Sequence, residues 1–144
     1  MAGMSAPEAN QQTAVSNFQV TADATFPVFV AKGTVVVESG SATFQANIAT
    51  SATAFTTFSL INLGTAGSGT TVVAGPNNTD VATNGGVAIT ALVPSHLTVV
   101  SAAKTLTDGQ VLGFHWNEAT TDVANADVTV SVRYTQASSP SVAG

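Results

Sequence analysis

The sequence predicts an all-β fold, an antiparallel β-sandwich of the jelly-roll type with about eight or nine strands. Hydrophobic and polar residues alternate with period two along most of the chain, which is typical of strands with one buried and one solvated face. β-Branched residues are abundant, and clusters of Gly, Asn, Ser and Pro separate the alternating segments. The jelly roll is favoured over the immunoglobulin type because the Cys…Trp…Cys pattern of disulfide-bonded immunoglobulin domains is absent.

Each strand is predicted from its own alternation of side chains. The clearest one, at residues 126–135, buries every second residue, including Val128, Val130, Val132 and Tyr134. In chain order, strands are predicted at residues 25–31, 33–38, 41–50, 56–63, 70–74, 87–93, 97–101, 110–116 and 126–135. Turns are predicted between them at Ser39-Gly40, Gly64–Gly69, Gly75–Asn78, Asn84–Gly86 and Asp108-Gly109.

The chain of 144 residues is predicted to hold one domain. We expect an N-terminal arm at residues 1–16, the β-sandwich at residues 17–136 and a C-terminal tail at residues 137–144. The segment Ser5-Ala6-Pro7-Glu8 has capping-box spacing, so at most one short helix is expected, near Pro7–Val15, with a flexible tail as the alternative.

Charge and composition exclude several classes of partner. The chain has three basic and eight acidic residues, which give a net charge of −5. This charge rules out nucleic-acid binding through the phosphate backbone and membrane binding through a polybasic segment. No apolar run is long enough to span a bilayer, and the first twelve residues do not form a typical signal peptide. The chain has no Cys, so disulfides, thiol catalysis and Cys-based zinc sites are excluded.

No residue cluster predicts catalysis, a metal site or a cofactor. His96 and His115 lack placed carboxylates, so a metal pair is a weak hypothesis. The acidic segment 117–127 could supply oxygen ligands to calcium, although it lacks the EF-hand spacing. The Gly-rich segment 64–71 lacks the Lys of a phosphate-binding loop. We therefore expect neither an enzyme, nor a cofactor, nor a small-molecule substrate.

The two distinctive aromatic residues are expected in the core. Trp116 is the only Trp and Tyr134 the only Tyr, and both lie among the apolar positions of an alternating strand. This placement disfavours an exposed aromatic platform for sugars.

Three segments together resemble small β-sandwich proteins on the heads of tailed bacteriophages, in particular capsid decoration (cement) proteins. They are Asn62–Thr70, Leu106–Leu112, in which Gln110 stands where an acid is common, and Asp127–Tyr134. The resemblance implies a non-enzymatic virion protein on the capsid surface that binds the major capsid protein, often as a homotrimer. Two alternatives remain open: a carbohydrate-binding β-sandwich module or fibre-tip adhesin, and a pilin-like or capsid shell subunit.

The arm is the predicted partner-binding segment. Its few apolar residues bury too little area to offset the cost of ordering, about 1–2 kcal/mol per residue. An ordered arm would therefore need the capsid shell or a neighbouring subunit, contacted through Pro7, Glu8, Gln11 and Gln12. Deleting residues 2–16 is expected to leave the β core folded and to abolish particle binding.

Overall fold

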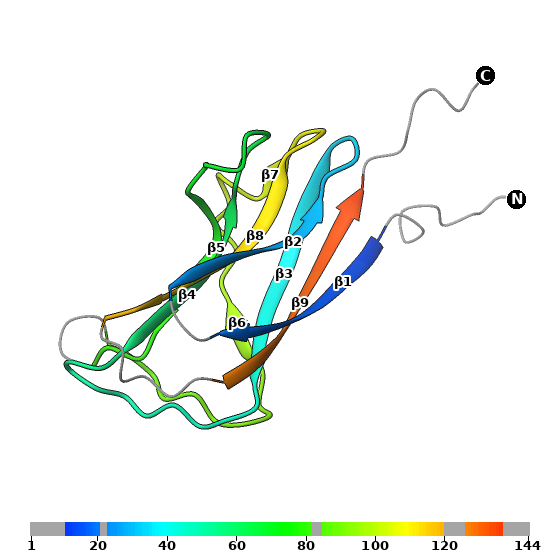
Figure 1. The fold of residues 1–144 in the computed structure, drawn as a ribbon. Coiled ribbons are helices and arrows are strands. Elements are labelled where there is room, and N and C mark those ends of the chain that lie inside the picture. Colours follow the sequence, from blue (N-terminus) through cyan, green and yellow to red (C-terminus); the bar gives the residue numbers. More distant parts are fainter. Residues whose placement is uncertain (1–10, 21–22, 82–84, 120–125, 137–144) are drawn as a thin grey trace, which may run out of the picture.

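A computed structural model describes residues 11–20, 23–81, 85–119 and 126–136 of the chain. These residues form strands and loops, with no helix among them, which confirms the predicted all-β class (Figure 1). The strands are β1 (Gln11–Val20), β2 (Ala24–Val30), β3 (Val35–Phe44), β4 (Thr56–Asn62), β5 (Thr71–Asn78), β6 (Ser95–Leu97), β7 (Thr105–Leu106), β8 (Val111–Glu118) and β9 (Ala126–Gln136).

Two antiparallel sheets form the sandwich. The first has the order β1-β9-β3-β6, with the short β7 also pairing with β3, and the second has the order β2-β8-β4-β5. The strand pairs are nested along the chain, since β1 pairs with β9, β2 with β8, β3 with β6 and β4 with β5. This nesting is the topology of a jelly roll, as the sequence predicts.

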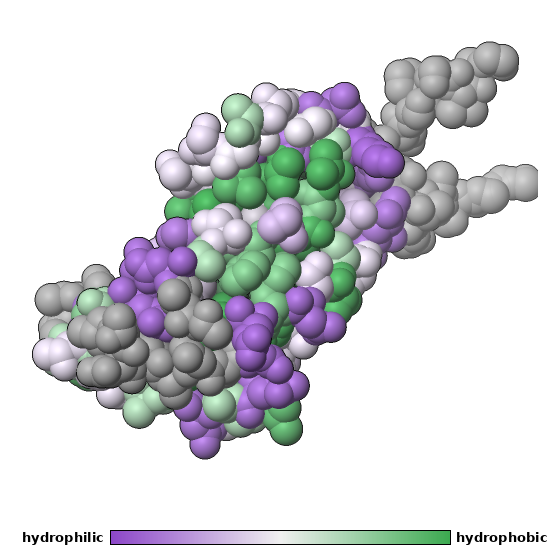
Figure 2. Space-filling view, in the orientation of Figure 1, coloured by the Kyte–Doolittle hydropathy of each residue, from purple (hydrophilic) through white to green (hydrophobic). Residues whose placement is uncertain are grey.

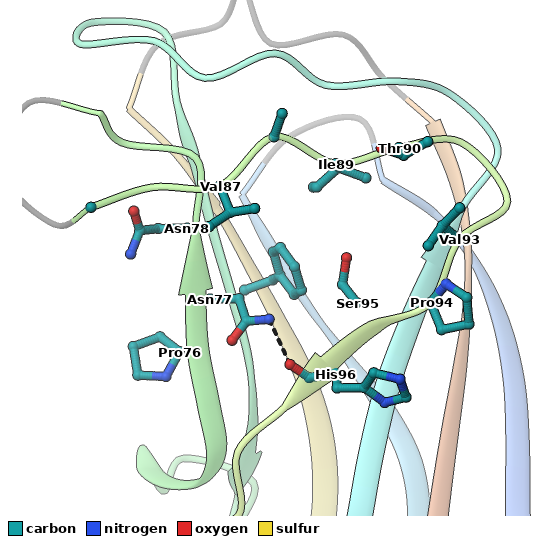
Figure 3. A pocket seen from close by; sticks show the side chains of 13 residues that line it. Pro76, Asn77, Asn78, Val87, Ile89, Thr90, Val93, Pro94, Ser95 and His96 are labelled. Carbon is teal, nitrogen blue, oxygen red and sulfur yellow. Dashed lines mark hydrogen bonds between the residues drawn. The ribbon is translucent and has the colours of Figure 1, made fainter.

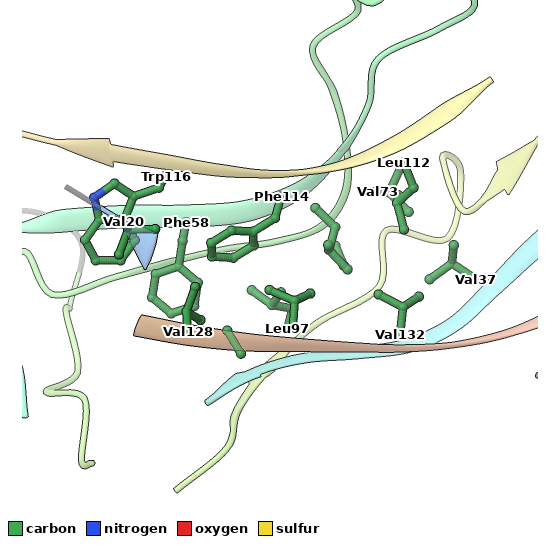
Figure 4. Packing of buried hydrophobic residues seen from close by; sticks show 14 of the residues in the cluster. Val20, Val37, Phe58, Val73, Leu97, Leu112, Phe114, Trp116, Val128 and Val132 are labelled. Atoms are coloured by element: carbon green, nitrogen blue, oxygen red, sulfur yellow. The ribbon is translucent and has the colours of Figure 1, made fainter. Parts of the chain in front are cut away.

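The core lies between the two sheets and changes in character along its length. At one end the aromatic rings of Phe44, Phe58 and Trp116 contact one another, with centroids 5.2 to 6.2 Å apart. At the other end the buried residues are aliphatic, as Figure 4 shows for Val37, Leu112, Val73 and Val132. The predicted burial of Val128, Val130 and Val132 is confirmed.

The first strand reaches into the segment that was expected to be an arm. Gln11–Val15 belong to β1, so the one short helix that the sequence allows near Pro7–Val15 does not form over these residues. Along β1 the residues Ala14, Ser16, Phe18 and Val20 are more buried than their neighbours, so the segment alternates with period two. Residues 1–10 lie outside the described part of the chain.

The turn predicted at Ser39-Gly40 is also wrong, because both residues lie within β3. The register against β9 shifts between Val37 and Ser39, so an irregularity takes the place of a turn. Gly40 serves packing here: a Cβ on it would lie 2.6 Å from Cδ1 of Leu60. Gly40 therefore marks a close approach of the two sheets and not the end of a strand.

The strand predicted at residues 87–93 does not form. Only Ile89 makes a bridge there, to Ile48, and the rest of residues 85–94 is a loop. Apolar residues in this loop produced a strand-like pattern although several of them face solvent.

The register of β3 separates two ends of the sandwich. Val35 pairs with Gln136, close to the Gln11–Thr135 pair. The start of β1 and the end of β9 therefore lie at one end of the sandwich. The same end holds loops 31–34, 63–70 and 107–110. We call this the arm end. Ala42 pairs with Ser95, which places residues 45–55, 79–81 and 85–94 at the opposite end, called the pocket end. Ten residues of β3 put the two ends about 30 Å apart.

Candidate binding surface

A solvent-open pocket of about 480 Å³ lies at the pocket end, between β5, the start of β6 and the loop that joins them (Figure 3). The loop runs across the pocket from Val87 through Ile89 and Thr90, then turns back through Val93 and Pro94 into β6. Phe58 forms part of the lining and is itself 1% exposed. The volume is in the range of small-ligand sites, and the lining mixes apolar residues with the polar residues Asn77, Asn78, Thr90, Ser95 and His96.

The rim of this pocket is unusually apolar for a surface. Val87 and Val93 line the pocket with exposed fractions of 73% and 52%, and Leu92, which precedes Val93, is 74% exposed. Residues 81–103 contain no Asp, Glu, Lys or Arg. An apolar patch that is rimmed by polar groups and carries no charge is typical of an interaction site.

Polar groups beside the pocket bond within the chain. Asn77 Nδ2 donates to the backbone oxygen of His96 at 2.8 Å, which ties β5 to β6 (Figure 3). Asn78 Oδ1 accepts from the backbone N–H of Asp80 at 3.0 Å. These bonds shape the wall of the pocket and do not pair a nucleophile with a base.

The two histidines lie in different sheets. His96 is exposed on β6, whereas His115 is half-buried on β8, with its Nδ1 2.9 Å from Oγ1 of Thr25. Within the described ranges no group of three or more His, Cys, Asp or Glu side chains is placed to hold a metal ion. The structure therefore does not bring the predicted histidine pair together.

The acidic segment 117–127 is only partly described, because residues 120–125 lie outside the described chain. The side chain of Glu118 accepts a hydrogen bond from Trp116 Nε1 at 3.0 Å, and its backbone N–H donates to Asp23 Oδ1 at 2.7 Å. Glu118 thus holds the position of a core tryptophan.

The Gly-rich segment forms a turn between β4 and β5. The backbone N–H of Gly64 donates to Asn62 Oδ1, and that of Gly69 donates to the oxygen of Leu63, both at 2.8 Å. Because these N–H groups bond within the turn, they do not form an anion cradle. The turn borders a depression of about 400 Å³ on the outer face of the second sheet, beside Thr25 and His115.

Neither distinctive aromatic residue forms an exposed platform. Trp116 is fully buried, as predicted. Tyr134 is half-buried and stacks on Phe29 with ring centroids 4.6 Å apart. Phe18 stacks on Phe26 at 4.7 Å, and Figure 2 shows hydrophobic residues gathered along the middle of the visible face, with hydrophilic residues bordering them. These rings close the side of the sandwich where β1 and β2 are the sheet edges.

Two of the four predicted partner-binding residues are described. Gln11 and Gln12 begin β1 at the arm end and are exposed. Gln12 Oε1 accepts a hydrogen bond from the hydroxyl of Tyr134 at 3.0 Å, so part of its capacity is used within the chain. Pro7 and Glu8 lie outside the described residues.

The edge formed by β1 is uncharged. The strand pairs with β9 on one side only, and residues 11–20 contain no Asp, Glu, Lys or Arg. An edge strand without charges or Pro can accept a further strand from a partner.

In the described part of the chain, no helix is long and apolar enough to cross a bilayer.

Comparison with solved structures finds a fold likeness. A chain of the structure titled "Cyanophage Pam1 capsid asymmetric unit" superposes with a TM-score of 0.51 and 18% sequence identity, covering 89% of this chain and 86% of that chain. At this identity the likeness establishes the fold. No protein-family model matches the sequence, and no curated protein matches it.

Proposed function

We propose that the chain is a virion structural protein that binds the outer surface of a phage capsid and stabilises it, as a decoration protein does. The observation that carries this proposal is the likeness of the whole jelly roll to a chain of a cyanophage capsid asymmetric unit, over 89% of this chain. Because folds host many functions, the likeness supports the proposal only together with the surface of this protein.

The surface suits extensive contact between proteins. Only 8% of the residues are charged, and Thr, Ser and Asn occupy many outward positions. Burying such a surface desolvates few charges, so large interfaces can form at low electrostatic cost. In this proposal the partner is the major capsid protein, the decoration protein is a homotrimer, and its location is the capsid surface.

The arm end is the proposed contact with the shell. Pro7, Glu8, Gln11 and Gln12 lie together in sequence at the entry to β1, and the β1 edge next to them has unpaired backbone groups on one side. An extended segment of the shell protein could add to this edge, with Gln11 and Gln12 bonding to its side chains.

The test is binding to particles that lack the protein, measured by co-sedimentation. Removal of residues 2–10 leaves the whole of β1 in place, so it is expected to weaken binding at least tenfold without lowering the thermal midpoint. Replacement of residues 2–10 by a Gly/Ser segment of equal length is the matched control for length. Unchanged binding of both variants would contradict the role of Pro7 and Glu8.

The same particles separate the proposed function from its alternatives. A decoration protein binds to shells that have already formed, and its removal lowers their stability without preventing assembly. If shells fail to assemble without the chain, it is a shell subunit. Binding to glycans in place of particles would support an adhesin, for which the burial of Trp116 leaves no platform at that residue.

A further inference from the structure

The edge strands of the two sheets differ in how they are protected against pairing with another chain. β2 contains Pro27, and its register against β8 shifts between Pro27 and Phe29. β5 contains Pro76, and its register against β4 shifts twice. β6 and β7, which both pair with β3 away from β9, are three and two residues long. Proline, irregular register and short length are common means by which proteins block a sheet edge.

The described part of β1 has none of these features. Its ten residues pair with β9 in an unbroken register from Gln11–Thr135 to Val20–Ala126, and they include no Pro and no charged residue. A long, regular and uncharged edge accepts a further strand readily. Among the described strands, β1 is therefore the edge best suited to extension of the sheet.

The register shows which residues of β1 direct their backbone groups away from β9. The oxygen of Asp127 accepts from the N–H of Gln45 at 3.0 Å, so the backbone of Asp127 faces β3. Because backbone groups alternate in direction along an antiparallel strand, Val128 and every second residue after it face β1. Their partners in the register are the even-numbered residues of β1. The backbone N–H and C=O groups that point outward belong to Gln11, Thr13, Val15, Asn17 and Gln19.

These five residues form a pattern that is complementary to itself. When two copies of β1 run antiparallel about a two-fold axis at Val15, Val15 faces its own copy. Thr13 then faces Asn17, and Gln11 faces Gln19. Every facing pair joins two residues with outward backbone groups, so every pair exchanges two hydrogen bonds. An apolar pair stands at the centre and uncharged polar pairs stand on both sides of it, as a contact that uses the same patch on both copies requires.

Charge favours a second copy that runs antiparallel. Among the described residues, the pocket end has no Lys or Arg and carries the acidic residues Asp23, Asp80, Glu118 and Asp127. The end with the arm holds the basic residues Lys32, Lys104 and Arg133, together with Glu38 and Asp108. Antiparallel pairing of β1 places the acidic end of each copy beside the basic residues of the other. Contact between two pocket ends would instead bring like charges together.

Apolar groups lie beside the same edge. Phe18 of β1 stacks on Phe26 of β2 with ring centroids 4.7 Å apart, and both rings are only partly buried. Hydrophobic residues gather along the face on which β1 and β2 lie in front (Figures 1 and 2). A further strand beside β1 brings its own inward residues next to these rings and removes apolar surface from water.

We propose that two copies of the free protein pair through β1, antiparallel about a two-fold axis at Val15, so that their first sheets become one continuous sheet. The proposal concerns the protein before it reaches a particle and goes beyond the proposed function, whose homotrimer and shell contact belong to the particle. Because the edge holds one added strand at a time, a shell segment that adds to β1 replaces the second copy.

Cross-linking tests the register, because the chain contains no Cys. Residues that face each other in a hydrogen-bonded antiparallel pair have Cα atoms about 5.5 Å apart, within the range of a disulfide. Oxidised Val15→Cys is expected to give at least fivefold more disulfide dimer than Asn17→Cys or Thr13→Cys alone. A mixture of Thr13→Cys with Asn17→Cys is expected to exceed either variant alone by a similar factor. Equal yields from all samples would overturn the two-fold axis at Val15.

Charge substitution at the axis tests the contact without a cross-link. Val15→Lys places two like charges opposite each other, so self-association measured by sedimentation equilibrium is expected to weaken at least tenfold. Val15 is 59% exposed, so the thermal midpoint of the monomer is expected to stay unchanged. A mixture of Val15→Lys with Val15→Glu is expected to associate again, and Val87→Lys, at a position 73% exposed on the pocket loop, is the matched control. Unchanged association of Val15→Lys, or a wild-type chain that stays monomeric, would refute the pairing.

Particle binding of the same variants keeps the two proposals distinguishable. If Val15→Lys associates normally and loses particle binding, the edge serves the shell protein alone and the pairing of copies is refuted. If Val15→Lys is monomeric and still binds particles, the pairing stands and the shell contact lies elsewhere. If the wild-type chain pairs through Val15 and does not bind particles, the inference stands and the decoration function fails.

Discussion

The two ends of the sandwich differ in how they meet solvent. At the arm end the loops carry charged side chains that bond to neighbouring loops, as Asp108 Oδ1 does to the N–H of Gly33 at 2.8 Å. The uncharged side chain of Gln136, at the end of β9, also donates to the backbone oxygen of Lys32. At the pocket end, residues 85–94 expose Val87, Leu92 and Val93, with no charge among them. Polar bonds within the chain occur at both ends, as the bond from the Glu118 N–H to Asp23 Oδ1 shows at the pocket end, and only the pocket end also exposes these apolar side chains on one loop.

The core differs between the same two ends. Trp116 and Phe58 fill the pocket end, whereas Val37 and Leu112 are among the aliphatic residues that fill the arm end (Figure 4). Phe44 packs against both of these rings. Large rings bury more area per residue than aliphatic side chains, and at the pocket end they pack beneath the exposed loop. The contrast indicates that the exposed apolar loop rests on a well-packed core.

The largest expected effect comes from shortening the arm end too far. Deleting residues 2–16 removes Gln11–Ser16 and their pairing with β9, so we expect substantial unfolding at room temperature. This prediction replaces the one from the sequence alone, that such a deletion leaves the core folded, because residues 11–16 pair with β9. Far-ultraviolet circular dichroism checks it, with the deletion of residues 2–10 as the control. A stable, fully β truncated chain would show that β1 contributes little.

The next largest effect is expected in the core at the pocket end. Trp116→Ala removes a fully buried ring and the hydrogen bond from its Nε1 to Glu118, and should destabilise the protein by about 3–5 kcal/mol. Val37→Ala at the arm end removes only two carbons and should cost about 2 kcal/mol. Urea unfolding followed by circular dichroism measures both. Equal losses would argue against a difference between the two halves of the core.

A smaller effect is expected from a pair of glycines. A Cβ on Gly86, at the pocket end, would overlap the backbone of Thr79 and Asp80, so Gly86→Ala should cost about 1–3 kcal/mol. Gly33, at the arm end, has open space but a φ of 71°, and Gly33→Ala should cost about 1 kcal/mol. Thermal unfolding of the two variants compares them. A larger loss for Gly33→Ala would mean that strain outweighs crowding.

The smallest effect is expected at the surface of the arm end. Tyr134→Phe removes the hydroxyl that donates to Gln12 Oε1 and keeps the stack on Phe29, so it should cost about 0.5–1 kcal/mol. Gln12→Ala should cost no more, because both partners are accessible to water. A loss several times larger would show that this bond orders the start of β1.

The fold class follows from the sequence because alternation records which face of a strand is buried. Val128, Val130 and Val132 alternate with polar residues and are buried as predicted. The sequence does not predict the strand Gln11–Val20, since its partner β9 lies more than a hundred residues away and the local apolar content gives no sign of it. The turn predicted at Gly40 is wrong for a similar reason, because glycine is required there by the close approach of Leu60 from the other sheet.

The candidate binding surface was harder to predict. Residues 87–93 show the composition of a buried strand, and only the tertiary structure reveals that Val87 and Leu92 face solvent. The signal available in the sequence was the long uncharged stretch 81–103, interrupted by turn residues. The predicted residues Gln11 and Gln12 lie at the other end, where Pro7 and Glu8 remain predictions.

The position of β9 between β1 and β3 has a consequence for synthesis of the chain. The second sheet needs only residues up to Glu118, so it can assemble while translation continues. The first sheet stays divided until Gln136 has left the ribosome, because its central strand is the last to emerge. Until then β1 and β3 expose unpaired edges, which favours association with other nascent chains. Folding of this protein during synthesis should therefore be more sensitive to slow translation of residues 126–136 than to slow translation of any earlier strand.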